Sequence, residues 1–213
     1  SLDSSLRRLK LEYVDIFYHH RPDPGTPLEE TMGALDSAIR AGKALYCGIS
    51  NYSGEETARA IEVCGREGLF KPVIHQPRYN MLDRTIEQGL LPVAARLGIG
   101  TIAFCPLAQG LLTSKYLEGI PKDSRAASPS PFLNKDRIKE ETLRKARALE
   151  ELARARGQTL AQTALAWTVR AGGVTSALIG ASRPEQVEEN ARALEKPDFT
   201  SEELARIDSI LAG

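Results

Sequence analysis

The chain has 213 residues, and its 28 lysine and arginine side chains are balanced by 28 aspartate and glutamate side chains. This balance gives no reason to expect a nucleic acid or an anionic membrane surface as a partner. A hydrophobic content of 42% suits a globular core, and no apolar run approaches the ~20 residues of a membrane span. The three cysteines, Cys47, Cys64 and Cys105, are widely spaced without a CxxC motif. They favour reduced thiols in a cytoplasmic protein over disulfides or a metal site.

Apolar segments bounded by Pro, Gly, Ser or Asn predict five strands, at residues 13–19, 44–49, 72–76, 100–104 and 174–179. Helical periodicity and capping residues predict helices at residues 27–42, 54–65, 86–97, 136–156, 159–171, 184–194 and 201–211. Leucines at helical spacing also predict a helix at the start of the chain. Residues 107–134, rich in Pro, Ser and Gly, form one long loop, and loops of this length are usually functional or disordered.

Three helix starts carry capping signals. Thr26 is followed by Pro27 and by a glutamate at the capping-box position, and Ser53 precedes the next helix. Ser182 is the predicted N-cap of the helix at 184–194, with a proline in its first turn. A helix start attracts anions, and the fork of Arg183 suits a phosphate. The alternative is a capped surface helix with a chance arginine.

Strands that alternate with helices, without a hairpin signal, predict an α/β fold with a parallel sheet and crossover helices. A doubly wound sheet and a TIM barrel both fit this order. The absence of a G-x-G-x-x-G motif weakens the Rossmann alternative. Polar or reactive residues lie at the carboxyl end of each predicted strand, at His19-His20, Ser50-Asn51, Gln76, Phe104-Cys105 and residues 180–182. Because barrel enzymes build their active sites at the carboxyl ends of strands, this pattern favours the barrel.

These strand ends resemble those of the aldo-keto reductases, and the resemblance covers essentially the whole chain. Residues 106–116 and 178–190 are similar over many consecutive positions to the subgroup that holds bacterial glyceraldehyde-3-phosphate reductases and potassium-channel β-subunits. The resemblance implies a (β/α)8 TIM barrel that binds NADPH/NADP+ and reduces a small-molecule carbonyl, without a metal. It implies neither a nucleic-acid nor a membrane partner, and it leaves a homo-oligomer open.

The resemblance also implies residue roles. His20 would hydrogen-bond the substrate carbonyl and orient it for hydride attack. Ser50, Asn51 and Gln76 would hold the carboxamide of the nicotinamide, and Phe104 would stack on its ring. The other cofactor contacts implied by the resemblance are Cys105, Pro106, Leu107, Gln109, Lys115, Arg125, Gly180, Ser182, Arg183, Gln186, Glu189 and Asn190. Among these, Arg183 would contact a 2′-phosphate, which favours NADP over NAD.

The strand at 13–19 corresponds to the fourth strand of the family's barrel. The first three strand–helix units, which carry the family's catalytic Asp, Tyr and Lys, have no counterpart here. Residues 1–213 are therefore expected to be one incomplete aldo-keto reductase domain, strands 4 to 8 with their helices, from a longer protein. Whether this chain alone reduces a carbonyl is left open.

Other residues suggest structural roles. By strand alternation His19 points away from His20, and His75 is expected to pack or hydrogen-bond inside the protein. Asp15 lies mid-strand, where we expect burial against a basic partner. Trp167, among apolar neighbours, is expected in the core.

Two other functions compete with carbonyl reduction. A regulatory subunit of the channel type would bind NADP with little turnover, but that type usually carries another residue at the position of His20. A phosphate-handling aldolase or isomerase would need a Schiff-base lysine or paired carboxylates at the strand ends. None of the five predicted strands ends in that way.

Overall fold

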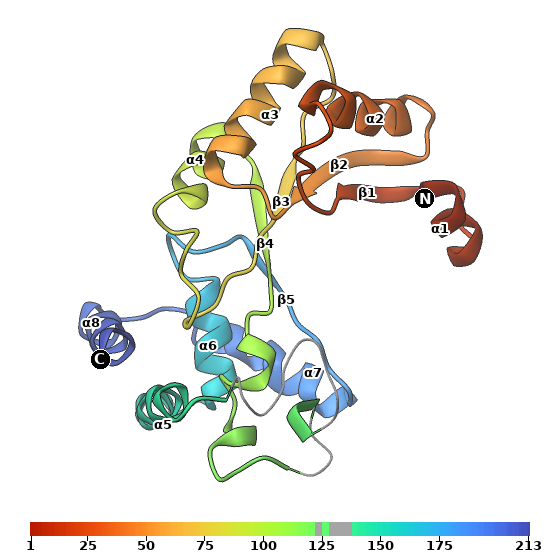
Figure 1. Cartoon of the computed structure of the whole chain (residues 1–213). Coiled ribbons are helices and arrows are strands. Elements are labelled where there is room, and N and C mark those ends of the chain that lie inside the picture. The colour runs from red at the N-terminus through yellow and green to blue at the C-terminus, as the bar shows by residue number, and fades with distance from the viewer. Residues whose placement is uncertain (122–124, 128–137) are drawn as a thin grey trace. The chain divides into compact units, whose positions relative to one another are not determined.

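A computed structural model of the chain describes residues 1–121, 125–127 and 138–213 (Figure 1). The chain forms two compact units. The first comprises Ser1–Arg78 and Thr85–Ile102, and the second comprises Tyr79–Arg84 and Ala103–Gly213. None of the helices in the described part is both long and apolar enough to cross a membrane.

The five predicted strands are present, as β1 (Val14–His19), β2 (Ala44–Ser50), β3 (Ile74–Gln76), β4 (Gly100–Phe104) and β5 (Ser176–Leu178). Their order in the sheet is β1-β2-β3-β4-β5, so β1 and β5 are the terminal strands. β1 pairs with β2, β2 with β3, and β3 with β4, in each case in parallel. The predicted α/β fold is confirmed, and the sheet of the described residues is open rather than closed into a barrel.

The first unit contains α1 (Leu2–Leu9), α2 (Leu28–Arg40), α3 (Gly54–Glu67) and α4 (Leu90–Leu97). The predicted cap at Ser53 is confirmed, because its hydroxyl accepts from the Glu56 N–H while the Glu56 carboxylate accepts from the Ser53 N–H. The predicted cap at Thr26 is wrong, since its hydroxyl donates to Asp23 and α2 has no side-chain cap. The helix expected from residue 86 begins only at residue 90.

The second unit contains α5 (Glu140–Ala155), α6 (Leu160–Thr168), α7 (Pro184–Ala191) and α8 (Ser201–Ala212). Short 3-10 turns also occur there, at η1 (Ala108–Gly110), η2 (Ser114–Tyr116), η3 (Arg125–Ala127) and η5 (Arg192–Glu195). α6 ends earlier than predicted because the chain turns back on itself. Val174 N–H donates to the Thr168 carbonyl, and a Cβ at Gly173 would lie 2.4 Å from that oxygen.

One face of β1 and β2 packs against α2 and α3. The buried cluster there consists of Met32, Leu35, Cys47, Ile49, Tyr52, Ala60, Val63 and Cys64, with Phe17 of β1 against it. Strand alternation places Gly48 and Ser50 on the opposite face of β2. On that face the Tyr18 ring covers Gly48, because a Cβ at Gly48 would lie 2.6 Å from Tyr18 Cε1. The sheet therefore has a helix-facing side and a side on which Ser50 lies.

Asp15 corrects one expectation. It was expected to be buried beside a basic side chain, but it is exposed in β1. β1 is a terminal strand, so its side chains have a neighbouring strand on one edge only. A solvated carboxylate needs no buried partner, and the predicted ion pair is wrong.

Trp167 is buried in the second unit, as predicted, with 1% of its surface exposed. Its ring stacks on Tyr79 with centroids 5.2 Å apart, and the Arg170 guanidinium lies 3.7 Å from its centroid. Arg170 also donates to the Tyr79 hydroxyl at 2.9 Å. These contacts anchor the segment Tyr79–Arg84 within the second unit.

Candidate active site

The carboxyl ends of β1, β2 and β3 lie at one level in the first unit. In the parallel register, His19 is opposite Ile49, and Ser50 is opposite Gln76. Ser50 and Gln76, with His20 directly after β1 and Asn51 directly after β2, are the residues of this unit for which the sequence predicts chemistry. Parallel pairing thus brings together segments that lie far apart in the chain.

Side-chain hydrogen bonds join these strand ends. Asn51 Nδ2 donates to the His20 carbonyl at 2.8 Å and approaches Ser50 Oγ at 3.0 Å. Ser50 Oγ donates to the Gln76 carbonyl at 2.7 Å. The four predicted residues of this unit, His20, Ser50, Asn51 and Gln76, therefore form one hydrogen-bonded set, which we call the strand-end group.

Asn51 has a left-handed backbone, with φ of 61°. Asparagine tolerates this conformation better than most residues, because its short side-chain amide forms hydrogen bonds with nearby backbone groups. Here the amide contacts Ser50 and the His20 carbonyl. His20 itself is exposed, so its imidazole is accessible to a ligand.

Behind the strand-end group lie three aromatic side chains. Tyr52 OH is 2.7 Å from His19 Nδ1, and the Tyr52 carbonyl is 3.1 Å from His75 Nε2. Because a carbonyl only accepts, His75 carries its proton on Nε2, and its buried Nδ1 has no hydrogen-bond partner among the described residues. Burial lowers the pKa of His75 to about 4 and also lowers the pKa of His19. Structural contacts thus account for both histidines, as the sequence suggests.

In the second unit, Phe104 ends β4, and the turn that follows contains Cys105, Pro106, Leu107 and Gln109. Cys105 and Gln109 both adopt left-handed backbone angles, with φ of 55° and 61°. Gln109 Nε2 lies 3.1 Å from Cys105 Sγ, and Asn80 Nδ2 donates to the Cys105 carbonyl at 3.0 Å. The side chains of Gln109 and Asn80 therefore fix Cys105 within the turn. The half-buried Phe104 ring lies directly before the turn.

The segment from β5 into α7 contains six more of the predicted cofactor contacts of this unit, Gly180, Ser182, Arg183, Gln186, Glu189 and Asn190. Leu107 and Ile179 pack against the same cluster of Leu165, Ala166 and Ala193, so the turn after β4 and the end of β5 share one core. β5 itself is only partly buried, because Ser176 and Leu178 are exposed and Ala177 between them is half-buried.

Ser182 is not the N-cap of α7. Arg183 occupies the N-cap position without a side-chain cap, and Pro184 is the first helical residue. The Ser182 N–H and hydroxyl instead bond Gln186 Oε1, at 2.8 and 3.2 Å. The predicted cap is wrong because the longer Gln186 side chain reaches back and takes both Ser182 donors.

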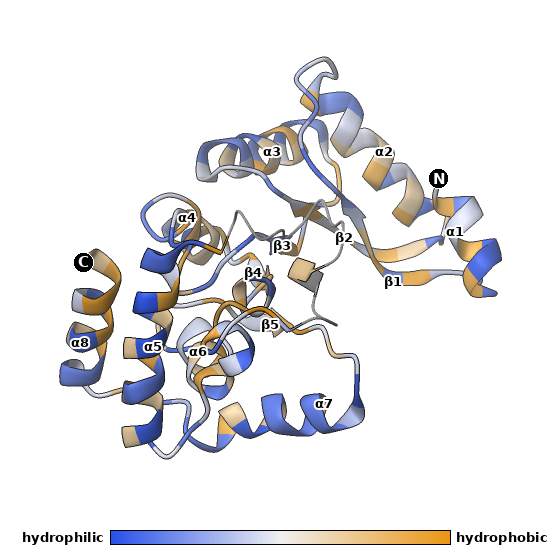
Figure 2. Cartoon of the chain, turned by 60° about the horizontal axis from the view of Figure 1, so that its bottom comes forward, coloured by the Kyte–Doolittle hydropathy of each residue, from blue (hydrophilic) through white to orange (hydrophobic). Residues whose placement is uncertain are grey.

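Other predicted contacts differ in exposure. Gly180, Ser182 and Arg183 are exposed, and α7 is mostly hydrophilic (Figure 2). Glu189 accepts from Gln162 through its backbone carbonyl, and Asn190 is buried. A phosphate would therefore have free access to the start of α7 rather than to its end.

Of the two basic residues in the long loop, the structure describes all of Lys115 but only the backbone of Arg125. Lys115 lies in η2, is exposed, and has its ammonium 5.9 Å from the Tyr116 ring centroid. The Arg125 backbone lies in η3, and its side chain is outside the part that the structure describes.

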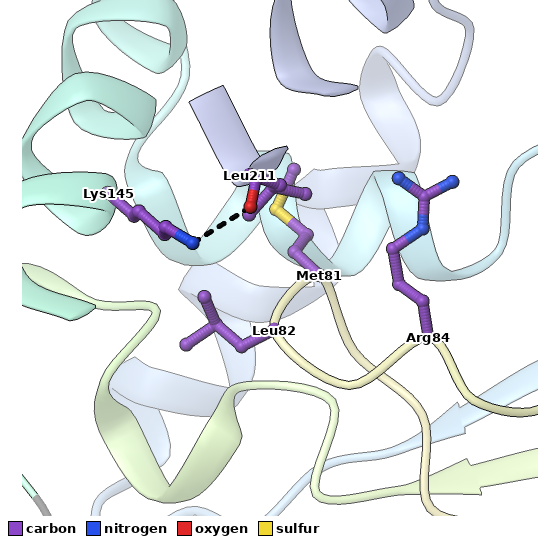
Figure 3. Close-up of a pocket in the computed structure, with 5 residues that line it drawn as sticks. All are labelled: Met81, Leu82, Arg84, Lys145 and Leu211. Carbon is purple, nitrogen blue, oxygen red and sulfur yellow. Dashed lines mark hydrogen bonds between the residues drawn. The ribbon is translucent and has the colours of Figure 1, made fainter. Parts of the chain in front are cut away.

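A cavity of about 180 Å³ in the second unit is lined by Met81, Leu82, Arg84, Lys145 and Leu211 (Figure 3). Lys145 Nζ donates to the Leu211 carbonyl at 2.8 Å. Its lining includes none of the predicted site residues, so this cavity is separate from the predicted chemistry.

A profile of the aldo/keto reductase family matches residues 1–212. The chain belongs to the aldo/keto reductase family. It is 51% identical to the L-glyceraldehyde 3-phosphate reductase of Escherichia coli K12, with all of this chain and 62% of that protein covered. It is 40% and 39% identical to proteins of Schizosaccharomyces pombe and Oryza sativa that carry provisional names as voltage-gated potassium channel beta subunits. These matches cover 62% and 65% of those two relatives.

Sequence reasoning assigned no functional role to Tyr52, which the structure places beside the strand-end group. Its side chain is 4% exposed, and it forms hydrogen bonds with His19 and His75, which lie 33 and 23 positions away in the sequence. The available signal was its position directly after the Ser50-Asn51 pair, three residues beyond the end of the predicted strand at 44–49.

The buried His75 predicts a pH dependence of stability. Its pKa is lowered, mainly by burial, from the ordinary 6.5 to about 4. Between these values the unfolded chain binds a proton that the folded chain excludes, so stability is full above pH 6.5 and falls as the pH decreases toward 4. The shift corresponds to about 3 kcal/mol of unfolding free energy.

Urea unfolding at pH 7 and near pH 4, with His75→Gln as the matched variant, measures this effect. Glutamine can still donate to the Tyr52 carbonyl but does not titrate. We expect a smaller loss of stability at low pH for the variant than for the unchanged chain. Equal losses would contradict the assignment to His75.

Proposed function

We propose that the protein carrying this chain reduces a small aldehyde or ketone to the alcohol, with NADPH as the hydride donor. The observation that carries this proposal is the 51% identity, over the whole chain, to a relative named L-glyceraldehyde 3-phosphate reductase. Glyceraldehyde 3-phosphate and related small carbonyls, methylglyoxal included, are the first substrates to test. A chain with reduced thiols, as its three free cysteines suggest, fits a cytoplasmic location.

The strand-end group suits the amide of a nicotinamide. Ser50, Asn51 and Gln76 offer amide and hydroxyl groups that donate and accept hydrogen bonds, which an amide requires. Asn51 and Ser50 are already fixed by bonds to neighbouring strand ends, so little side-chain freedom is lost on binding. When bound, the dihydronicotinamide supplies the hydride, and the protein supplies its position.

The role proposed for His20 is to orient the substrate. Its carbonyl is bonded to Asn51, which fixes the backbone, while the ring stays exposed. An imidazole N–H directed at a carbonyl oxygen stabilises the negative charge that develops there during hydride transfer. In this proposal His20 holds the substrate oxygen beside the amide-binding side chains.

The start of α7 suits the phosphates of the adenosine half. Ser182 and Arg183 are exposed, and Pro184 begins a helix whose first N–H groups favour anions. Phe104 would stack on the nicotinamide. Backbone and side-chain groups at Cys105, Pro106, Leu107, Gln109, Lys115 and Arg125 would contact the pyrophosphate. The Cys105 thiol is a weak hydrogen-bonding group, so the backbone carries most of any contact there.

A regulatory, NADP-binding role with little turnover is the second candidate. It is favoured by the 40% and 39% identities to relatives provisionally named as channel beta subunits. The lower identity of those relatives, and the accessible His20, favour the reductase.

The reduction is tested by following NADPH consumption with glyceraldehyde 3-phosphate or methylglyoxal. His20→Ala should lower kcat/KM by about 10²–10⁴-fold and leave the Kd for NADPH nearly unchanged, because the ring orients the carbonyl. Asp15→Asn, exposed on β1, is the control. Binding of NADPH without consumption would favour the regulatory role. Equal turnover by His20→Ala and the unchanged protein would contradict the role of His20.

The preference for NADPH is tested at Arg183. Arg183→Ala should raise the Kd for NADPH by about 10- to 100-fold, since a charge-assisted hydrogen bond to the 2′-phosphate is lost. NADH lacks that phosphate, so its Kd should change little. Arg192→Ala, exposed in η5, is the control. An equal loss of NADPH and NADH affinity would refute the 2′-phosphate assignment.

A further inference from the structure

Tyr52 connects three strand ends in the first unit. Its hydroxyl is 2.7 Å from His19 Nδ1 at the end of β1, and its carbonyl is 3.1 Å from His75 Nε2 in β3. Its own backbone continues β2. The ring also meets both imidazoles edge to face, with centroids 5.9 Å from His19 and 6.5 Å from His75. We call this arrangement the histidine–tyrosine bridge.

Each member of the bridge adjoins a member of the strand-end group in the sequence. His19 precedes His20, Asn51 precedes Tyr52, and Gln76 follows His75. His19 and His75 lie on the helix-facing side of the sheet with Ile49, whereas Ser50 and Gln76 lie on the other side. Tyr52 also packs on the helix-facing side, because the left-handed backbone of Asn51 interrupts the strand alternation after β2. A shift of one bridge residue along its strand would therefore move its neighbour in the strand-end group.

Two members of the bridge, Tyr52 and His75, are buried and His19 is half-buried, which makes the hydrogen bonds of the bridge costly to break. Tyr52 is 4% exposed and His75 is 0% exposed. Burial raises the pKa of Tyr52 to about 12, so its hydroxyl keeps its proton over the physiological range. A buried polar group that loses its partner has no water to replace it, so the bonded arrangement is strongly preferred.

We propose that Tyr52 is a positioning residue: its hydrogen bonds to His19 and His75 keep His20, Asn51 and Gln76 in register for the nicotinamide and the substrate. This inference rests on the proposed function, because the ligand whose position it sets is NADPH. Tyr52 itself contacts neither ligand in this account. It acts through the backbone of its neighbours.

The test compares two ligands that share the adenosine half. Tyr52→Phe removes only the hydroxyl, so the ring contacts and the carbonyl bond to His75 remain. The variant should weaken the binding of NADPH by about two- to tenfold, since the loss of affinity cannot exceed the net contribution of the one hydrogen bond that is removed. Adenosine 2′,5′-bisphosphate, which has no nicotinamide, should bind as it does to the unchanged protein.

Two further variants keep the test interpretable. Tyr46→Phe removes an exposed hydroxyl from β2 and should change neither Kd. His19→Leu breaks the same bond from its other end, and serves if Tyr52→Phe does not fold. The double variant His19→Leu with Tyr52→Phe should raise the Kd for NADPH no more than the single variant with the larger effect, because each substitution removes the same hydrogen bond.

The outcomes separate this inference from the proposed function. If the unchanged protein binds neither NADPH nor adenosine 2′,5′-bisphosphate, the proposed function fails. If it binds both ligands, and Tyr52→Phe lowers the affinity for both equally or for neither, the positioning role is overturned. A loss confined to NADPH, absent in Tyr46→Phe, supports it.

Discussion

Parallel register between β1, β2 and β3 is the constraint on which the rest of the candidate site depends. It places His19 opposite Ile49 and Ser50 opposite Gln76, so the polar residues at the carboxyl ends of these strands meet at one edge. A slip of one residue would turn each side chain to the other face and bury the wrong set. The apolar side of β2 against α2 and α3 opposes such a slip, and the bonds of Asn51 and Tyr52 add polar cross-links at the strand ends.

Much of the fold follows from local sequence. The five strands are predicted because short apolar runs are bounded by Pro, Gly, Ser and Asn, and their alternation with helices predicts the parallel sheet. Ser53 works as a cap because its capping-box partner Glu56 is in place, and Trp167 is buried as its apolar neighbours suggest. These features depend on residues within a few positions of one another, which a single sequence displays.

The remaining features depend on partners that local patterns do not show. Gln186 reaches back to Ser182 and removes it from the cap position, and the terminal place of β1 leaves Asp15 in solvent. The bond between Tyr52 and His19 spans 33 positions of sequence, so periodicity cannot predict it. The strand-end placement of His20, Ser50, Asn51 and Gln76 was expected from the pattern, whereas their roles came from resemblance to a family and stay proposals.

The histidine–tyrosine bridge and the strand-end group together give the sheet polar residues on both sides of its strand ends. The central claim is that the strand-end group, in which His20 is exposed and Asn51 and Gln76 are half-buried, holds a nicotinamide amide. A crystal structure of the protein with NADP+ bound tests this most directly. The account predicts the carboxamide within ~3 Å of the Asn51 and Gln76 side chains, with the 2′-phosphate beside Arg183. A nicotinamide bound away from Asn51 and Gln76 would contradict it.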